Sequence, residues 1–139
     1  MPILVLDGSI TVSWFVSDET SSSSLSILDL AASGGAAVPD LWRIEVGNAL
    51  LMAERRGRIA PSARIRAIAA LGELQIDVDR ETYDRAWAGI FSLAERFRLT
   101  LYDAAYLDLA SRTRLPLASL DRELRKAAVS LGVAVLPED

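Results

Sequence analysis

The chain has 139 residues, 51% of them hydrophobic, and a formal net charge of −4 at neutral pH. This length can bury a core and the apolar fraction excludes wholesale disorder, so we expect a single domain over residues 1–139. Cys and His are both absent, which excludes disulfides, thiolate and imidazole metal sites, Cys nucleophiles and His general bases.

The beginning of the chain does not have the pattern of a targeting signal. Residues 1–7 lack a basic segment, and Asp7 interrupts their apolar run. No apolar run elsewhere approaches the roughly 20 residues of a membrane helix. We therefore expect neither a secretion signal nor a membrane span, and a cytoplasmic protein.

Short apolar runs alternate with helical patterns along the chain. The predicted strands are residues 3–6, 36–38, 75–78, 117–119 and 133–136. The predicted helices are residues 21–32, 41–56, 61–73, 81–97, 102–113 and 122–131. Thr20 or Ser21 is expected to cap the first of these helices, Pro61 to begin the third, and Gly57 and Gly132 to end helices. Continuous apolar strands separated by helices indicate an α/β fold, a three-layer sandwich with a five-stranded parallel sheet flanked by helices.

Four acidic residues stand inside apolar stretches: Asp7, Glu45, Asp103 and Asp121. A carboxylate seldom stays near a core unless something compensates its charge. Without His or Cys, the simplest shared compensator is a divalent cation bound by oxygen ligands. The sequence therefore predicts a Mg²⁺ or Mn²⁺ site built from carboxylates.

The predicted topology can bring these four acids together. In parallel sheets, ligands gather at the carboxyl ends of the strands, where the winding direction reverses. Asp7 ends the first strand and Asp121 follows the fourth, while Glu45 lies early in the helix after the second strand and Asp103 opens the helix before the fourth. We expect convergence at one edge, where a bound cation would activate water and stabilise charge on a phosphodiester.

Polar residues flank the acids, and simpler explanations exist for some of these side chains. Ser9, Asn48 and Ser119 are expected to hydrogen-bond the carboxylates or hold water molecules of the metal, although local capping is an alternative. Asp103 could complement the dipole of a helix capped by Thr100, and Asp121 could itself be an N-cap.

Arginines and tryptophans form two further groups. The Arg-rich zone, residues 55–66, is a candidate for steering an RNA backbone, or else a solvated helical face; it contains Arg55, Arg56, Arg58, Arg64 and Arg66. Trp14, Phe15 and Trp42 are expected in the core, although aromatic residues are also enriched at interfaces.

Four segments resemble the PIN-domain family, and within it the VapC-type toxins of toxin–antitoxin pairs. They are Val-Leu-Asp-Gly-Ser (5–9), Pro-Asp-Leu-Trp-Arg-Ile-Glu-Val-Gly-Asn-Ala-Leu (39–50), Leu-Thr-Leu-Tyr-Asp-Ala-Ala-Tyr-Leu-Asp-Leu-Ala (99–110) and Leu-Ala-Ser-Leu-Asp-Arg-Glu-Leu-Arg-Lys-Ala-Ala (117–128). They follow the order of the family over almost the whole chain, and the Tyr-Asp-Ala-Ala-Tyr segment is the most specific of them.

The resemblance implies a five-stranded parallel sheet and an endoribonuclease that depends on Mg²⁺ or Mn²⁺. Asp7, Glu45, Asp103 and Asp121 match the acidic positions of the family, in which the fourth acid is often less firmly tied to the metal. The polar positions beside them are matched by Ser9, Asn48 and Ser119. The resemblance further implies a homodimer and inhibition by a small antitoxin that lays a segment across the site.

Three other functions remain open on the residues. A phosphatase with an aspartyl nucleophile would want a second acid two residues after Asp7, where this chain has Ser9. A receiver-like signalling domain that binds Mg²⁺ would want a Lys near the end of the fifth strand, but the sole Lys, Lys126, precedes that strand inside a predicted helix. A binding module with a vestigial acidic site is the third alternative.

Overall fold

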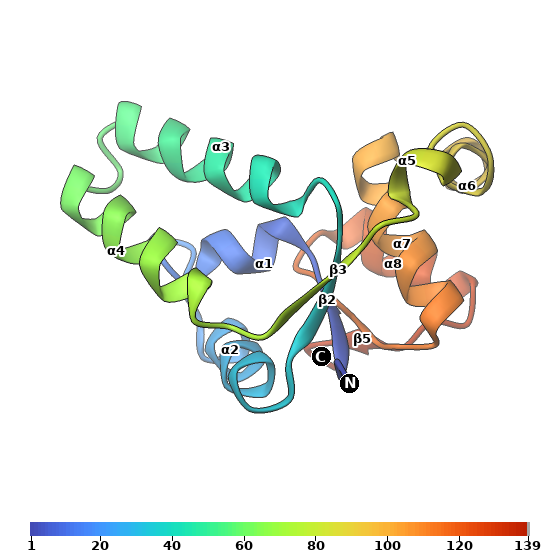
Figure 1. Ribbon diagram of the computed structural model, residues 1–139, viewed down its shortest axis with the longest axis horizontal. Helices are drawn as coiled ribbons and strands as arrows, with labels where there is room; N and C mark the ends of the chain where they lie inside the picture. The colour runs from blue at the N-terminus through green and yellow to red at the C-terminus, as the bar shows by residue number, and fades with distance from the viewer. Residues whose placement is uncertain (139) are drawn as a thin grey trace.

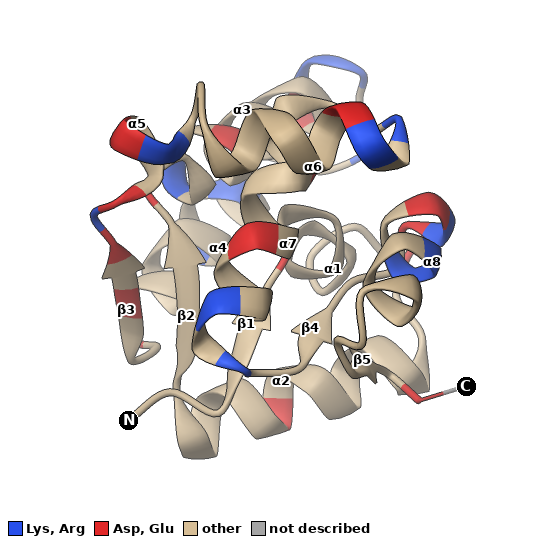
Figure 2. Cartoon of the chain, turned by 90° about the vertical axis from the view of Figure 1, so that its right-hand side faces the viewer, with Lys and Arg blue, Asp and Glu red and all other residues tan. Residues whose placement is uncertain are grey.

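A parallel five-stranded sheet lies between two groups of helices in the computed structural model, which describes residues 1–138 (Figure 1). The strands are β1 (Leu4–Leu6), β2 (Ala36–Pro39), β3 (Ile76–Asp79), β4 (Leu117–Ala118) and β5 (Val135–Leu136). They are arranged in the order β3-β2-β1-β4-β5 across the sheet (Figure 2), and every neighbouring pair is parallel. The predicted α/β three-layer sandwich is confirmed.

The helices divide into two layers, one on each side of the sheet (Figure 1). One layer contains α1 (Gly8–Ser13), α2 (Ser22–Gly34), α3 (Trp42–Arg55) and α4 (Pro61–Gly72). The other contains α5 (Thr82–Arg85), α6 (Gly89–Phe97), α7 (Leu101–Thr113) and α8 (Arg122–Ser130). Helix α7 crosses directly in front of the sheet in Figure 2 and contacts β1, β2 and β4. Among the described residues, no helix combines the length and the apolar character needed to cross a bilayer.

Local signals set the ends of several helices. Ser21, one of the two predicted caps, accepts a hydrogen bond from the backbone N–H of Ser24 and begins α2. Thr100 caps α7 in the same way, through the N–H of Asp103. Gly57 and Gly132 adopt φ of +74° and +82° just after α3 and α8. Glycine tolerates this left-handed conformation, so both predicted helix ends are confirmed.

The structure differs from the predicted elements at two places. Residues 81–97 form α5 and α6 rather than one helix, and residues 86–88 turn between them. Helix α1 was not predicted, because its sequence, Gly-Ser-Ile-Thr-Val-Ser, has three β-branched residues and few strong helix formers. Tertiary contacts stabilise it instead, since five of its six residues are buried and it packs against α3.

Buried aromatic side chains fix α1 and α3 against each other. Trp14 and Trp42 are buried and belong to the core, as predicted, and Phe15 packs against it with partial exposure. The indole Nε1 of Trp42 donates to Oγ1 of Thr11 (3.2 Å), and that hydroxyl donates to the carbonyl oxygen of Asp7 (2.9 Å). The helix that carries Glu45 is thereby tied to the segment that follows β1.

The winding direction of the sheet reverses between β1 and β4, which lie side by side. Val5 pairs with Leu117 and Leu6 with Ala118. The N–H of Asp7 then donates to the carbonyl oxygen of Ala118 (3.0 Å). The ends of two strands more than a hundred residues apart in sequence therefore meet at the position where α/β sheets place their ligands.

Candidate acidic active site

One open pocket brings the four predicted acids together. It has a volume of about 410 Å³, and its lining includes Asp7, Glu45, Asp103 and Asp121. Asp7 follows β1, Glu45 lies in the first turn of α3, Asp103 in the first turn of α7, and Asp121 immediately precedes α8. Each side chain reaches the pocket from a different segment, as the topology at the carboxyl edge of the sheet requires.

Asp7 is the most deeply placed of these acids and is held by two hydroxyl groups. Its side chain is 3% exposed, and Oδ2 accepts hydrogen bonds from Oγ of Ser9 (2.7 Å) and Oγ of Ser119 (2.6 Å). Burial raises the pKa of Asp7, and these hydrogen bonds offset part of that increase. The two serines therefore stabilise the ionised carboxylate in a place where solvent cannot.

Ser119 also connects Asp7 to Asp121. Its buried hydroxyl accepts a hydrogen bond from the backbone N–H of Asp121 (3.0 Å) while it donates to Asp7. Asp121 is exposed and caps α8, because Oδ1 accepts from the N–H of Leu124 (2.9 Å). The capping role anticipated for Asp121 and its place in the pocket are therefore compatible.

Glu45 is positioned by a buried tyrosine and a neighbouring glycine. The hydroxyl of Tyr106, a fully buried residue of α7, donates to Oε1 of Glu45 (2.6 Å). Burial raises the pKa of Glu45, the Tyr106 hydrogen bond opposes this effect, and the charge of Asp7 adds to it. A Cβ on Gly8 would lie 2.7 Å from the same Oε1, so a larger residue there would displace the carboxylate.

Asp103 shows that the four acids interact electrostatically. Its pKa is raised to about 6, first by burial and then by the charges of Asp7, Asp121 and Glu45. All three neighbours contribute, so the like charges of the pocket lie close enough to oppose one another. A pocket of this kind favours either proton uptake or a bound cation.

The donor chemistry of the pocket fits Mg²⁺ or Mn²⁺, because every candidate ligand is an oxygen. Hydrogen bonds occupy Oδ2 of Asp7, Oε1 of Glu45 and Oδ1 of Asp121, and leave the second oxygen of Glu45 and of Asp121 without a donor from residues 1–138. Within the same residues, no three acidic side chains are already arranged as a ligand group for a metal. Like charges oppose a closer approach of these side chains, and a bound cation would offset that repulsion.

Asn48 does not join the hydrogen-bond network that was predicted for it. It is exposed on α3, one turn after Ile44, and it makes no hydrogen bond to any of the four acids. It lines a second hollow together with Glu45. Ser9 and Ser119, in contrast, both contact Asp7 as predicted.

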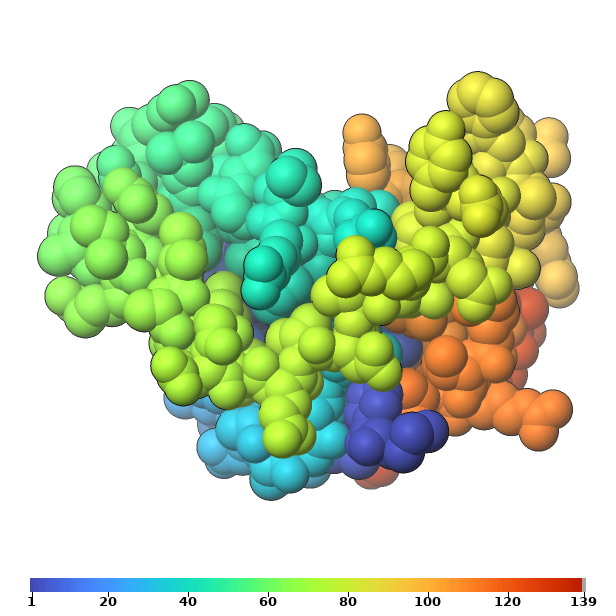
Figure 3. All heavy atoms as spheres, viewed as in Figure 1, coloured from blue at the N-terminus to red at the C-terminus, as the bar shows by residue number. Residues whose placement is uncertain are grey.

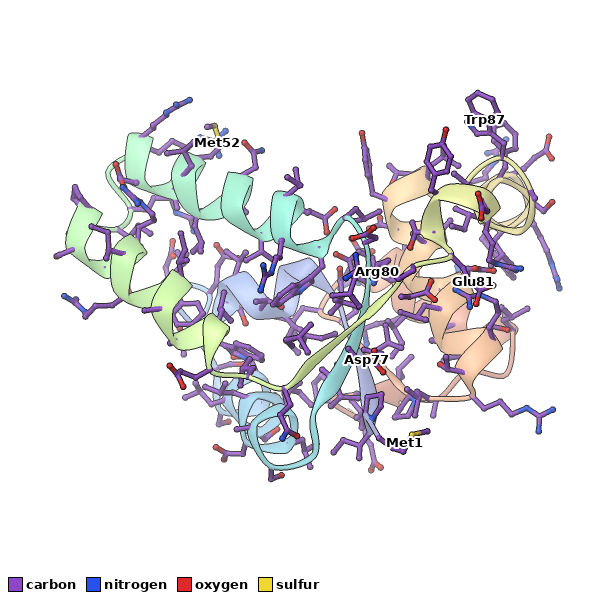
Figure 4. The ribbon with its side chains drawn as sticks, viewed as in Figure 1. Met1, Met52, Asp77, Arg80, Glu81 and Trp87 are labelled. Carbon is purple, nitrogen blue, oxygen red and sulfur yellow. The ribbon has the colours of Figure 1, made fainter. Side chains whose placement is uncertain are left out.

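The Arg-rich zone divides between the pocket and the outer surface. Arg56 and Arg58 line the acidic pocket, as does Met52 (labelled in Figure 4). Arg58 is held by Asp18 and Glu19 at 2.9 and 2.8 Å. Arg56 is exposed and has no ion-pair partner among residues 1–138. The pocket therefore combines carboxylates with guanidinium groups.

Sequence reasoning did not assign roles to Tyr106 or to the glycine after Asp7. Tyr106 ends the Tyr-Asp-Ala-Ala-Tyr segment that resembles the PIN-domain family, but the resemblance gives it no role of its own. Its spacing from Asp103 was a usable signal, because residues three apart share a helix face, and the structure has both on the α7 face toward the site. Gly8 gave no signal, since its constraint comes from Glu45, 37 positions later in the chain.

Comparisons with known proteins agree with this fold. The model of the PIN domain family matches residues 4–130. Ribonuclease VapC3 of Pyrobaculum aerophilum is 30% identical over 130 residues, which cover 87% of this chain and 91% of that protein. A crystal structure of a Pyrobaculum aerophilum protein superposes with a TM-score of 0.67 and 23% identity, and covers 91% of this chain and 84% of that one. This last likeness concerns the fold.

Proposed function

The chain belongs to the PIN-domain family and is of the VapC type, and from that premise we propose that it is a metal-dependent endoribonuclease that hydrolyses RNA phosphodiester bonds. The observation that carries the proposal is the single pocket in which Asp7, Glu45, Asp103 and Asp121 meet from four separate segments of the chain. Four carboxylates that oppose one another in one pocket are the arrangement that a divalent cation relieves. The similarity to a protein named as a ribonuclease supplies the class of substrate.

Asp7, Glu45 and Asp103 are the residues that we assign to hold Mg²⁺ or Mn²⁺, with Asp121 completing the site or orienting water. The bound metal would supply an activated water and stabilise negative charge on the phosphodiester. The chain contributes fixed ligand geometry, because Ser9 and Ser119 hold Asp7.

We assign substrate binding to the arginines that line the same pocket. Arg56 presents an exposed guanidinium to this pocket. Arg58 also lines the pocket, but it forms ion pairs with Asp18 and Glu19. Guanidinium groups bind phosphate through paired N–H donors. A backbone phosphate next to the scissile one would therefore contact Arg56, while the scissile phosphate would bind at the metal that the carboxylates hold.

The biological context that we propose is that of a toxin in a toxin–antitoxin pair, in the cytoplasm. Its partners would be RNA as the substrate, a second copy of the chain in a homodimer, and a small antitoxin protein that covers the pocket. The similarity to a VapC protein supports this context. Copurification of the chain with the product of a neighbouring reading frame, and loss of RNA cleavage in that complex, would test it.

The structure supports neither the aspartyl phosphatase nor the receiver-like signalling domain. The residue two positions after Asp7 is Ser9, whose hydroxyl is engaged by Asp7 itself, so no second acid is available to a phosphatase there. Lys126 is exposed on α8 and does not line the acidic pocket.

Purified protein incubated with total RNA tests the proposed activity. Wild type should cleave in Mg²⁺ or Mn²⁺ and stop when a chelator is added. Asp7→Asn and Asp103→Asn should each lower cleavage at least about a hundredfold, since each removes a ligand charge. Asp29→Asn, on the exposed side of α2, is the matched control and should cleave normally. Wild-type rates in either pocket variant, with folding verified by circular dichroism, would refute the assignment.

A further inference from the structure

We propose that the hollow next to the acidic pocket binds one unpaired nucleobase of the RNA and thereby selects where the RNA is cut. This hollow, here called the Tyr102 hollow, is lined by Leu41, Ile44, Glu45, Asn48 and Tyr102 and has a volume of about 380 Å³. The inference rests on the proposed ribonuclease function, and it concerns residues that this function does not use.

The position of the Tyr102 hollow follows from Glu45, which lines both cavities. Tyr102 also directly precedes Asp103, an acid of the neighbouring pocket. From the side drawn in Figure 3, the surface is notched between α3 and the α5–α6 pair, with the start of α7 standing in the notch. A nucleotide whose phosphate lies at the carboxylates therefore has its base within reach of this hollow.

The chemistry of the hollow suits a neutral base rather than a phosphate. No Lys or Arg is among its lining residues, and its one ionisable acid is Glu45, which would repel an anion. Two of its lining residues are exposed hydrophobic side chains, Tyr102 at 63% and Ile44 at 79%. Unpaired RNA bases stack on exposed aromatic rings, and each stack contributes about 1–3 kcal/mol to binding.

Asn48 and the rigidity of α7 add selectivity to this stacking surface. The exposed carboxamide of Asn48 makes no hydrogen bond within residues 1–138, so its donor and acceptor are both available to a base edge. Tyr102 lies in the first turn of a helix whose N-terminus Thr100 caps. The backbone that carries the ring is therefore already ordered, so mainly side-chain freedom is lost when a base stacks on it.

Direct binding of RNA tests the Tyr102 hollow separately from cleavage. Short fluorescein-labelled single-stranded RNAs are titrated with protein in a chelator, where anisotropy reports the dissociation constant. Tyr102→Ala should weaken binding about 5- to 150-fold, which is the stacking contribution expressed as a ratio, whereas Tyr102→Phe keeps the ring and should bind like wild type. Tyr83→Ala is the matched control, because Tyr83 is 89% exposed on α5 and does not line the hollow.

Cleavage-site sequencing with Mg²⁺ provides the second readout. Asn48→Ala should broaden the preference for the base at the cut site while total cleavage persists. Equal RNA affinity of Tyr102→Ala and wild type, or an unchanged site preference in both variants, would overturn the inference. So would a change of oligomeric state in Tyr102→Ala with unaltered RNA affinity, since the hollow would then contact protein.

The two proposals fail in different ways. If wild type binds RNA with the expected dependence on Tyr102 but does not cut it in Mg²⁺, the ribonuclease proposal is wrong and the base-binding hollow stands. If wild type cuts RNA and the hollow variants behave like it, only the present inference is wrong. A wild type that binds none of the RNAs overturns both.

Discussion

At the scale of single residues, the pocket depends on groups that hold the acids as much as on the acids themselves. The four carboxylates could be predicted because acids in apolar stretches are conspicuous in sequence. Tyr106 and Gly8 could not, because their roles arise only when α7, α3 and the end of β1 meet around Glu45. Burial, followed by the neighbouring Glu45, raises the pKa of Tyr106, which keeps its hydroxyl protonated as a donor.

Tyr106→Phe should weaken Mn²⁺ binding about 10-fold, because Glu45 loses the hydrogen bond that fixes Oε1 and favours its ionised form. Isothermal titration calorimetry of Mn²⁺ into the metal-free protein measures the change. The melting temperature in chelator reports whether the fold is intact, since Phe fills the same buried space. Unchanged Mn²⁺ affinity in a folded variant would show that Tyr106 is merely a core residue.

Asp103 predicts a pH dependence of the metal-free protein. Its pKa in the fold is about 6, above its ordinary value of 3.8, so the folded state binds the proton more tightly than the unfolded state. Ionisation of Asp103 therefore costs stability: the free energy of unfolding should fall as pH rises from about 4 to about 6, by about 1 kcal/mol, because solvent screens a half-buried carboxylate. Asp103→Asn should flatten the profile of melting temperature against pH in chelator. An equally steep profile in the variant would contradict this.

At the scale of elements, the sequence was informative about strands and long helices and misleading where tertiary contacts dominate. Strand positions agreed to within one or two residues at every end, because buried parallel strands are short apolar runs. Helix α1 has weak helix propensity and forms because α3 covers it. The division of residues 81–97 likewise follows long-range contacts, since Arg85 of α5 pairs with Asp108 of α7.

This ion pair fixes α5 against α7. Buried Asp108 accepts from Nε and Nη2 of Arg85, both at 2.7 Å, and from Nε of Arg112 at 2.9 Å. Although burial opposes ionisation, these hydrogen bonds lower the pKa of Asp108. Its stabilising contribution is therefore complete above the ordinary carboxyl pKa and is lost as pH falls through the lowered value.

Asp108→Asn should reduce the free energy of unfolding by about 1–3 kcal/mol at pH 7, because two guanidinium groups lose a charged acceptor. Urea unfolding followed by circular dichroism measures the difference. Asp84→Asn, an exposed position on α5, should leave stability within about 0.5 kcal/mol of wild type. Equal stability of the Asp108 variant and this control would show that the pair does not hold α5.

At the scale of the whole molecule, charge is distributed unevenly. The chain has 15 Lys and Arg and 19 Asp and Glu, so the four acids of the pocket account for the entire net charge of −4. Acidic and basic residues intersperse over the outer helices α5, α6 and α8 (Figure 2), and the exposed Trp87 points away from the body of the molecule (Figure 4). Four of the acidic side chains therefore meet in one pocket, whose lining also includes Arg56 and Arg58.

Divalent cations should accordingly stabilise the fold as a whole. At a Mg²⁺ or Mn²⁺ concentration 100 times the dissociation constant, binding adds about 2.7 kcal/mol, enough to raise the melting temperature by several degrees. Asp7→Asn should abolish that increase. Differential scanning fluorimetry with and without the ion measures it, and an equal rise in wild type and variant would show that the cation acts elsewhere.

The adjacency of β1 and β4 has a consequence for biosynthesis. A nascent polypeptide that still lacks residues 117–121 has neither β4, which pairs with β1, nor the Ser119 hydroxyl that donates to Asp7. Its first three acids are already translated, but the segment that holds Asp7 in place is not. The complete acidic pocket can therefore form only after residues 117–121 have been translated.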